Sequence, residues 1–496
     1  MMASLTVGAI DLGAESGRVA GVDFDGTRLD LSVVHRFLHT PSDRNGRSHW
    51  NMDHIWSEIH TGLLNLATSS QVRSLGVDSF GVDYGLFGPE GELLEDPVTY
   101  RESARQDAFR RATTEVSLAE FYQHTGSQVL PINTIFSLIA ERDLRPELLR
   151  SASYLLMLAD VFHRKLSGSK VTERSAVSTS GMYDMAKDSW AFGLIDQLNL
   201  PRHLLPEVAE PGTRLGRVIG DLAANGLSKT EVIMPAAHDT ASAVASIPGV
   251  DKNCLYISSG TWSLVGVITP QPVITAETLR FNLTNEAGYP NNIRVLRNLM
   301  GLWPVQECRR VWAEQGDSWD YAELMDMASK EPALVSIVDP ADTAFLSPGN
   351  MPRRIQDYCK AAGFPVPQTK AQIVRVVIDS LALSYRIAAE DIQLATGVSV
   401  NEIRVVGGGV NNTLLQQATA DATGLPVIAG SAEATVLGNA MIQLISLGEI
   451  ADLEQGWQVI AATVSEKTYL PHEPERYTAM AQAFRNLQAA VIDTGR

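Results

Sequence analysis

The sequence predicts an α/β protein built from two domains, and three observations support this prediction. The chain has 496 residues, which is too many for one compact core. Strand-like apolar segments alternate with segments of helical periodicity along the chain. Two hairpin-like segments with small residues at their turns open the two halves. We expect domains over residues 1–247 and 248–496, because Pro248 and Gly249 punctuate the chain between them.

The first half contains one expected hairpin, followed by strands and helices. The segment Val7 to Val22 is an apolar run, a polar turn with glycines and a second apolar run, which is typical of a β-hairpin. We expect strand elements at residues 75–85. Residues 131–144 and 153–166 have the apolar spacing of helices.

The second half repeats this order. Residues 255–267 again indicate a hairpin with small residues at the turn. Residues 371–396 have apolar side chains near helical spacing, and Gly397 is a typical helix end. We expect a buried strand at 402–406. Another strand, at 426–429, leads into a helix of small residues.

The composition is that of an ordinary soluble globular protein, with 45% hydrophobic and 20% charged residues. Forty basic side chains stand against 57 acidic ones, so the formal net charge is −17. Such a field repels nucleic acids and anionic membranes, and we expect neither as a partner. A phosphate ligand is still compatible, because backbone amides and a bound cation can reverse the local potential.

The cysteines and the N-terminus predict a cytoplasmic protein. The three cysteines, Cys254, Cys308 and Cys359, are too few and too widely spaced for a disulfide framework or a zinc site. Residues 1–6 lack the basic stretch and apolar run of a signal peptide. No apolar segment approaches the length that spans a bilayer.

The first hairpin turn has the chemistry of a phosphate site. Gly13 and Gly17 let the backbone turn sharply and approach a ligand, and Ser16 adds a hydroxyl group. Asp11 ends the apolar strand, where a carboxylate could hold a hydrated Mg²⁺. The alternative is a polar hairpin in which Asp11 only makes a local turn.

The second hairpin repeats this chemistry in Ser258, Ser259, Gly260 and Thr261. Two domains that each present such a turn could hold one polyphosphate between them. The glycines at 407–409 follow a buried strand, where they could admit a flat ring or simply make room for a packing turn.

Several catalytic motifs are absent from the sequence. There is no Walker loop, no His-Glu-x-x-His and no Gly-x-Ser-x-Gly, which excludes P-loop kinases, zincins and α/β-hydrolases. No Gly-x-Gly-x-x-Gly opens the helix after the glycine run, which disfavours a nicotinamide-dependent oxidoreductase.

Asp239 has two interpretations. It lies between His238 and Thr240, directly before a run of small residues that we expect to be helical. An aspartate there can cap the helix. It can also act as a general base on an incoming hydroxyl group. The two roles are only partly compatible, because a carboxylate bonded inward is not free to accept a proton.

Several polar residues lie within or beside apolar segments, as in sugar sites, where each desolvated hydroxyl group needs a partner. These residues are Gly81, Asp83, Asn133, Asn298 and Gln306. Each one alone is more often a satisfied core or turn residue.

Taken together, the segments resemble the FGGY carbohydrate kinases over nearly the whole chain. The segments that carry the resemblance occur in family order, at residues 11–18, 81–83, 100–101, 238–240, 258–264, 298–303 and 407–411. Three further segments, at residues 130–134, 283–288 and 432–439, indicate a narrower resemblance to one group of enzymes within this family.

This resemblance implies two actin-like (ribonuclease H-like) ATPase domains around a central cleft. It implies that the nucleotide contacts Ala14, Glu15, Ser16, Gly17 and Arg18 from the first domain and Thr261, Gln306 and Gly408 from the second. It places Asp11 near Mg²⁺. The expected sugar-binding residues are Gly81, His238, Asp239, Thr240 and Asn298, with Asp239 as the proton acceptor.

The implied reaction is ATP-dependent phosphorylation of a ketose, L-rhamnulose at its terminal O1. L-Fuculose, L-xylulose and L-ribulose are the alternatives, because one changed contact can shift sugar preference tenfold or more, on the order of 1–3 kcal/mol. The rival of another class is a non-catalytic actin-like nucleotide-binding protein. The sequence leaves open whether the chain forms a homodimer.

Overall fold

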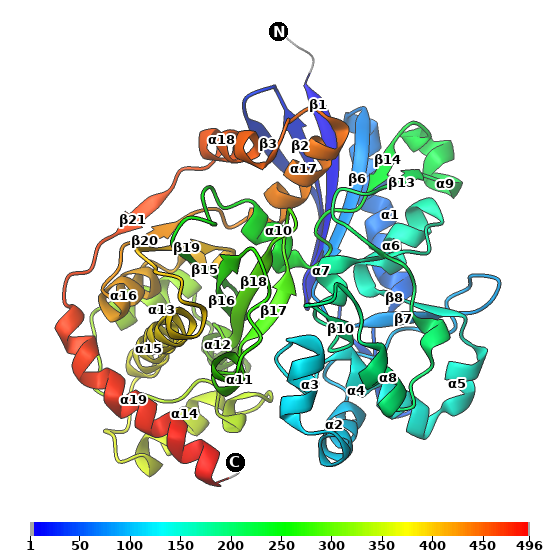
Figure 1. Cartoon of the computed structure of the whole chain (residues 1–496). Helices are drawn as coiled ribbons and strands as arrows, with labels where there is room; N and C mark the ends of the chain where they lie inside the picture. Colours follow the sequence, from blue (N-terminus) through cyan, green and yellow to red (C-terminus); the bar gives the residue numbers. More distant parts are fainter. Residues whose placement is uncertain (1–3, 495–496) are drawn as a thin grey trace. The chain divides into compact units, whose positions relative to one another are not determined.

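The computed structural model describes residues 4–494 and divides the chain into two compact units. Unit 1 comprises residues up to Gly249 together with Ile268–Val295 and Glu433–Val464. Unit 2 comprises Val250–Val267, Leu296–Ala432 and the residues from Ser465 onward. Figure 1 shows the elements of both units. Residues 1–3, on which the expectation of no signal peptide partly rests, lie outside the described residues.

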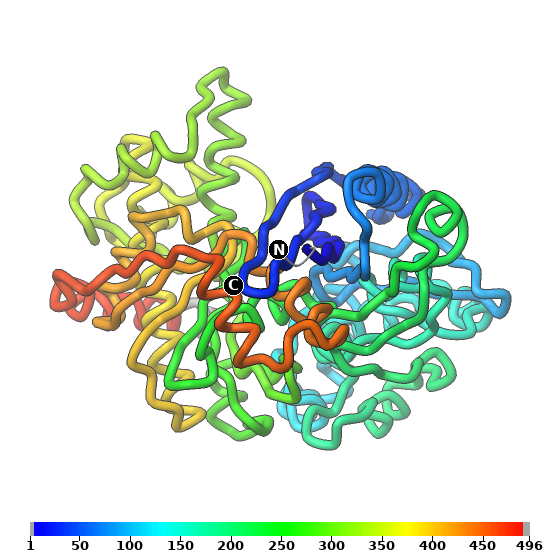
Figure 2. Tube along the Cα trace, turned by 90° about the horizontal axis from the view of Figure 1, so that it is seen from above, coloured from blue at the N-terminus to red at the C-terminus, as the bar shows by residue number. Residues whose placement is uncertain are grey.

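The division into units does not follow chain order. The first border, between Gly249 and Val250, lies close to the expected boundary at 247/248. Two later segments, 268–295 and 433–464, pack with the first half of the chain. The orange segment in Figure 2 accordingly lies beside the blue N-terminal strands. Its Gln443 donates a hydrogen bond of 3.0 Å to the carbonyl of Gly8.

Unit 1 is built around a six-stranded mixed sheet. Its strands, in spatial order, are β13 (Arg214–Arg217), β14 (Glu231–Ile233), β6 (Val72–Ser79), β1 (Leu5–Leu12), β2 (Ser16–Phe24) and β3 (Leu29–Leu38). Strands β1, β2 and β3 are antiparallel neighbours, whereas β6 runs parallel to β1 and β14 runs parallel to β6. The expected first hairpin is therefore confirmed, and it forms the centre of the sheet.

Helices cover both faces of this sheet. Helix α1 (Met52–Ser69) places Leu66 over Gly8 on one face. Helix α17 (Ala434–Leu447) places Asn439 over Gly76 on the other. Helix α10 (Asp239–Ala245) packs against α17. The unit also contains α6 (Leu158–Ser167) beside β6 and α18 (Leu453–Thr463) beside β3.

The remaining elements of unit 1 are shorter or lie outside the sheet. Its other helices are α2 (Ser103–Glu115), α3 (Leu118–Thr125), α4 (Thr134–Leu144), α5 (Pro146–Ser151), α7 (Arg174–Val177), α8 (Phe192–Gln197), α9 (Gly220–Leu222) and α11 (Ala276–Arg280). Its other strands are β4 (Ser42–Arg44), β5 (Arg47–His49), β7 (Tyr84–Phe87), β8 (Tyr154–Met157), β9 (Thr172–Glu173), β10 (Tyr183–Asp184), β11 (Ser189–Trp190), β12 (Val208–Ala209) and β17 (Thr284–Ala287).

Unit 2 repeats the strand arrangement of unit 1. Its strands belong to a seven-stranded sheet whose spatial order is β17 (Thr284–Ala287, of unit 1), β18 (Ile293–Met300), β16 (Trp262–Thr269), β15 (Cys254–Ser259), β19 (Glu402–Val406), β20 (Val427–Ala429) and β21 (Lys467–Tyr469). Strands β15 and β16 form the second expected hairpin, β19 lies parallel to β15, and β20 lies parallel to β19. In both units the first strand of the hairpin therefore pairs with the parallel strands of the sheet, β1 with β6 and β15 with β19.

Local signals decide the helices of unit 2. The helices are α12 (Trp303–Glu314), α13 (Tyr321–Ser329), α14 (Met351–Ala361), α15 (Lys370–Thr396), α16 (Thr413–Thr423) and α19 (Pro474–Thr494). Helix α15 begins with a reciprocal capping box between Thr369 and Gln372. It ends at Gly397, whose φ of +71° is left-handed, as expected for a helix C-terminus.

One expected helix is wrong in its first part. Residues 153–166 were predicted as a single helix, but the structure has strand β8 followed by helix α6. Strand β8 pairs antiparallel with β7. A four-residue apolar run fits a buried strand as well as a helix, so the partner strand decides between them.

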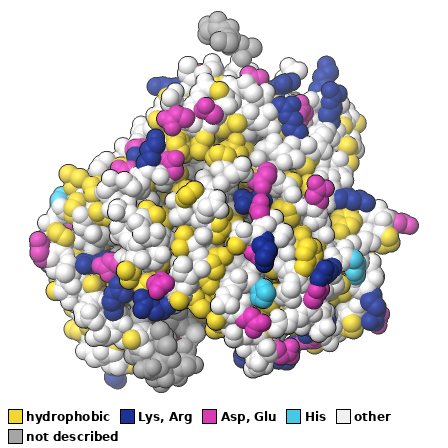
Figure 3. Space-filling model, viewed as in Figure 1, with side chains coloured by type: hydrophobic (Ala, Val, Ile, Leu, Met, Phe, Trp, Pro, Cys, Tyr) yellow, Lys and Arg dark blue, Asp and Glu magenta, His cyan; other side chains and the backbone are white. Residues whose placement is uncertain are grey.

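The described residues contain no helix that is long and apolar enough to cross a membrane. All three cysteines are free and buried. On the face drawn in Figure 3, basic and acidic side chains are interspersed.

Candidate functional site

The turn of the first hairpin is held by a histidine from the third strand region. The amide of Gly13 donates to the carbonyl of Ser16 at 3.0 Å, which closes the turn. Nε2 of His39 lies 2.9 Å from the carbonyl oxygen of Gly13, and the His39 amide donates to Glu15. Ala14 and Ser16 are half-buried and Glu15 is exposed. The turn is therefore fixed, and its outer residues are open to a ligand.

Gly17 has a packing reason to be glycine. A Cβ atom there would overlap the ring of Phe37 and lie 2.9 Å from Leu12. From the sequence, Gly17 is expected to allow a sharp turn and the approach of a ligand. The structure shows that the neighbouring strand also requires it.

Asp11 and Arg18 face each other across the hairpin. They are register partners of β1 and β2, and Nε of Arg18 donates to Oδ2 of Asp11 at 2.9 Å. Arg18 also forms an ion pair with Glu433. Burial raises the pKa of the Asp11 carboxyl, and the Arg18 guanidinium opposes this shift. Asp11, expected near the metal, and Arg18, expected to contact a phosphate, therefore form an ion pair with each other.

Asp78 is a site residue that the sequence analysis did not single out. It is the register partner of Asp11 on the parallel strand β6 and is fully buried. Its Oδ2 accepts a hydrogen bond from Asn439 at 2.5 Å, whereas Oδ1 has no hydrogen-bond partner among the described residues. Burial raises its pKa well above the usual range, and the charges of Asp11 and Asp239 add to this. The sequence signal that could have identified Asp78 is the presence of an acidic residue within an apolar strand.

The carboxylates of Asp11, Asp78 and Asp239 are compatible with a divalent cation that keeps most of its water ligands. The charge of Asp239 raises the pKa of both Asp11 and Asp78, and the charge of Asp11 also raises that of Asp78, so a nearby cation would relieve this repulsion. Among residues 4–494, no three His, Cys, Asp or Glu side chains are grouped closely enough to ligate a metal together. Mg²⁺ suits such a site, since it binds few carboxylates and keeps several waters.

The start of α10 presents Asp239 with one carboxylate oxygen occupied. His238 takes the N-cap position, so the interpretation of Asp239 as the N-cap is wrong. Oδ1 of Asp239 accepts from the amide of Thr240 at 2.5 Å and from its hydroxyl group at 3.2 Å. Oδ2 has no hydrogen-bond partner among the described residues, and the side chain is 28% exposed. The carboxylate is therefore bonded inward through one oxygen only.

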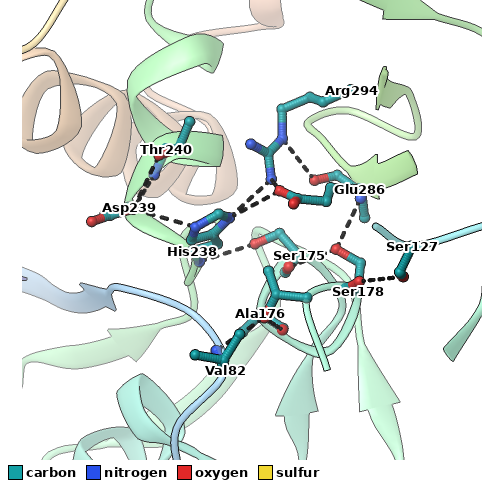
Figure 4. Close-up of polar contacts among 12 residues, drawn as sticks. Val82, Ser127, Ser175, Ala176, Ser178, His238, Asp239, Thr240, Glu286 and Arg294 are labelled. Carbon is teal, nitrogen blue, oxygen red and sulfur yellow. Dashed lines mark hydrogen bonds and ion pairs between the residues drawn. The ribbon is translucent and has the colours of Figure 1, made fainter. Parts of the chain in front are cut away.

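A buried carboxylate clamps the backbone directly before Asp239. Oε2 of Glu173 accepts a 2.9 Å hydrogen bond from the amide of Ala237. Oγ of Ser175 accepts one of 3.1 Å from the amide of His238, as Figure 4 shows. Ser175 in turn donates its hydroxyl to Glu173. Burial raises the pKa of Glu173 to about 7. Sequence reasoning missed this clamp, because nothing near Glu173 in the chain marks it.

Gly81 lies in a tight bend held by Thr179. Oγ1 of Thr179 accepts from the amide of Val82 at 3.0 Å, and a Cβ atom on Gly81 would lie 2.6 Å from the same oxygen. Val82 has a φ of +69°, a strained value for a branched residue. The glycine is thus required by close packing in this bend.

Asp83 and Asn133, which the sequence analysis considered for sugar contacts, are satisfied inside the protein. Asp83 is fully buried and accepts hydrogen bonds from Trp50 at 2.7 Å and from Arg105 at 2.6 Å. Asn133 bonds the backbone of Leu130 and Thr179. Both therefore act as structural supports of the loops they join.

Unit 2 brings its expected nucleotide residues together. The hydroxyl of Thr261 donates to Oε1 of Gln306 at 3.3 Å. Gly409 packs against Ser259 so closely that a Cβ atom would overlap the Ser259 side chain. In contrast, no atom of the described part of the chain lies within 4 Å of a Cβ added to Gly408. Thr261, Gln306 and the glycine run thus lie around the end of β15.

The expected sugar-binding residues are divided between the units. Gly81, His238, Asp239 and Thr240 belong to unit 1, and Asn298 lies on the unit 2 part of β18. That Asn298 acts together with the other four stays a prediction.

The chain matches known proteins over nearly its whole length. The N-terminal domain model of the FGGY family of carbohydrate kinases matches residues 6–246, and the C-terminal domain model matches residues 255–447. Rhamnulokinase of Bacteroides thetaiotaomicron is 36% identical over 480 residues, which cover 96% of this chain and 98% of the relative. Rhamnulokinase of Enterococcus faecalis is 37% identical and covers 93% of both chains.

Solved structures share the fold. A gluconate kinase and a ligand-bound xylulose kinase, both from Lactobacillus acidophilus, each match with a TM-score of 0.82 at 16% identity. The matches cover 99% and 98% of this chain, and 98% of each kinase. The predicted α/β fold of two actin-like domains is confirmed. From the domain models and the full-length relatives, the chain belongs to the FGGY family of carbohydrate kinases, enzymes that use ATP and a divalent metal to phosphorylate sugars.

Proposed function

We propose that the protein transfers the terminal phosphoryl group of ATP to O1 of L-rhamnulose, with Mg²⁺ as the divalent metal and Asp239 as the general base. The substrate is inferred from the relatives named rhamnulokinase, which match over nearly their full length. The observation that carries the mechanism is the unpartnered Oδ2 of Asp239. Its other oxygen is held by Thr240.

In this mechanism Asp239 accepts the proton of the sugar hydroxyl as that oxygen attacks the γ-phosphorus. Because Oδ1 is hydrogen-bonded, the carboxylate cannot rotate freely and Oδ2 is held in one orientation. This lowers the entropic cost of reaching the reactive geometry. The Glu173–Ser175 clamp supports the same direction, because it holds the peptides that precede Asp239.

The hairpin turn of residues 13–16 and the pair of Thr261 and Gln306 would contact the nucleotide. Asp11 would hold Mg²⁺ through water, and the ion would neutralise charge on the phosphates. Arg18 would have to give up part of its interaction with Asp11 to reach a phosphate, because both contacts use the same guanidinium. Positioning and charge neutralisation supply most of the rate in phosphoryl transfer.

The experiment is an ADP-release assay over L-rhamnulose, L-fuculose, L-xylulose and L-ribulose, with the phosphate position determined by NMR. We expect the highest kcat/KM for L-rhamnulose and phosphate on O1. Preference for another ketose, or phosphate on another oxygen, displaces the substrate assignment within the family. Sugar-independent turnover of ATP would favour the non-catalytic actin-like alternative.

The three buried free cysteines fit a reducing compartment, and we infer a cytoplasmic enzyme. Fractionation of cells that express the natural gene tests this. Formation of a homodimer stays a prediction, and light scattering of the purified protein tests it.

A further inference from the structure

A line of polar side chains, buried except at Asp239, runs from Glu286 through Arg294 and His238 to Asp239 (Figure 4). Glu286 lies in β17 and Arg294 lies in β18, and both belong to unit 1, as does α10. Nη2 of Arg294 lies 2.9 Å from Oε2 of Glu286 and 3.0 Å from Nδ1 of His238. On the other side of the imidazole, Nε2 lies 3.5 Å from Oδ1 of Asp239.

The contact with Arg294 determines which nitrogen of His238 carries the proton. A guanidinium group only donates hydrogen bonds, so Nδ1 of His238 must be the acceptor. The single proton of the imidazole is then on Nε2. Oε2 of Glu286 also faces this Nδ1, but at 3.4 Å it is farther away than Nη2 of Arg294 at 3.0 Å.

This tautomer places the Nε2–H group on the side of the ring that faces Asp239, where Nε2 lies 3.5 Å from Oδ1, longer than a normal hydrogen bond. Oδ1 of Asp239 therefore faces donors only, namely Nε2 of His238 and the amide and hydroxyl of Thr240. In the other tautomer, the lone pair of Nε2 would face the carboxylate, and the repulsion would turn the carboxylate away. The tautomer thus fixes which oxygen remains for the substrate.

The Arg294 side chain is held in one orientation, although one of its buried N–H groups has no hydrogen-bond partner among the described residues. The side chain is 0% exposed, and Nε donates to the carbonyl of Ala287 at 3.1 Å, which fixes the plane of the guanidinium. Nη1 is buried and has no hydrogen-bond partner among the described residues. A buried donor without a partner destabilises the folded state, so stability alone does not account for this residue.

We propose that Arg294 is a positioning residue for phosphoryl transfer. It fixes His238 as the Nε2–H tautomer, and His238 then orients Asp239 so that Oδ2 receives the proton of the sugar hydroxyl while the new O–P bond forms and ADP leaves. The inference rests on the proposed role of Asp239. Its first half, the tautomer, does not depend on the identity of the sugar.

The first test is the tautomer itself. Long-range ¹H–¹⁵N correlation spectra of the full chain with ¹⁵N-labelled histidine report the protonated nitrogen of each imidazole. The chain has 10 histidines, and the spectrum of His238→Gln assigns the signal that disappears. We expect His238 to be protonated on Nε2. A proton on Nδ1 in the natural protein overturns the proposal, whatever the substrate is.

The second test is the kinetics of Arg294→Met, which removes the donor and keeps an apolar side chain of some length. We expect kcat to fall on the order of 10- to 100-fold, while KM for the ketose changes less than about threefold. His238 should then show a mixture of tautomers. A folded variant with the natural kcat and the natural tautomer overturns the proposal.

The matched control is Arg47→Met, which removes another partly buried ion pair of unit 1, that with Glu141 at 2.6 Å. Because Arg47 contacts none of the site residues, we expect kcat to be retained. If Arg294→Met does not fold, Arg294→Lys keeps the charge but loses the planar donor geometry, and the same loss of kcat with unchanged KM is expected.

Two results separate this inference from the proposed function. Natural turnover in Asp239→Asn would show that Asp239 is not the base. The proposed positioning role of Arg294 in catalysis would then fail as well, even if His238 is protonated on Nε2. A different preferred ketose would change the substrate only, and the Arg294→Met comparison would then be made with that ketose.

Discussion

Gly438 of α17 lies so close to Ser242 of α10 that a Cβ atom at position 438 would overlap the Ser242 carbonyl oxygen. The overlapped atom is backbone, so no side-chain rotation can relieve the contact. Helix α10 carries Asp239 at its first turn. The absence of a side chain at position 438 therefore allows α10, the helix that carries the proposed base, to pack closely against α17.

Gly438→Ala should shift α10 and lower both stability and turnover. Overpacking of this kind costs about 1–3 kcal/mol. Thermal unfolding and kcat measure the two effects. The matched control is Gly193→Ala in α8, where the nearest atom, Cε1 of His124, would be in ordinary contact at 3.6 Å. Equal behaviour of the two variants would contradict the prediction.

Asp239→Asn should retain sugar binding and lose most turnover. Asparagine keeps an oxygen that Thr240 can bond, but it cannot accept a proton as a carboxylate does. We expect kcat to fall on the order of 10²- to 10⁴-fold. Calorimetric titration with the ketose should show an affinity within a few-fold of the natural one. Asp221→Asn, at an exposed site in α9, is the control, and natural turnover in Asp239→Asn would rule out the assigned base.

The glycine run of unit 2 offers two neighbouring substitutions with opposite expectations. Gly409→Ala places a methyl group onto the Ser259 side chain, and we expect a loss of stability of about 1–3 kcal/mol. Gly408→Ala meets no atom within 4 Å, so the melting temperature should stay unchanged. If Gly408 lines the nucleotide site, KM for ATP should rise in that variant alone. An unchanged KM would remove Gly408 from the site.

Glu173 should make stability depend on pH. Burial raises its pKa from the ordinary value of 4.5 to about 7 in the folded protein. Between these values the folded state keeps a proton that the unfolded chain has released. The contribution of Glu173 to stability therefore falls as pH rises through this window, by at most about 3 kcal/mol.

Urea unfolding of the natural protein and of Glu173→Gln, from about pH 5 to about pH 8, measures this effect. The difference in unfolding free energy should move in favour of the glutamine variant as pH rises. Movement in the opposite direction would show that the hydrogen bonds from Ser175, Ala176 and Ala237 dominate over burial. Glu314→Gln, at an exposed site, is the control.

Elements with strong local signals could be predicted from the sequence. The two hairpins follow from apolar runs on both sides of small turn residues, and α15 follows from its periodicity and from Gly397. Strand β8 could not be separated from a helix, because four apolar residues carry no period and the pairing with β7 decides.

The candidate site divides in the same way. Asp11, Asp239 and the turn at residues 13–16 stand in segments whose composition marks them. Glu173 and Arg294 do not, because each lies in a short polar or strand segment like many others. Their importance comes from contacts with residues 237 and 238, which are distant in the chain.

The sequence by itself determined the layered α/β architecture, the repeated hairpins and the identity of the carboxylate at the start of α10, since these depend on neighbours along the chain. Only the tertiary structure decided which oxygen of Asp239 has no partner within residues 4–494 and which nitrogen of His238 faces Arg294. Those facts depend on distances between side chains from separate elements. Such distances are set by sheet pairing and helix packing, and a one-dimensional pattern does not contain them.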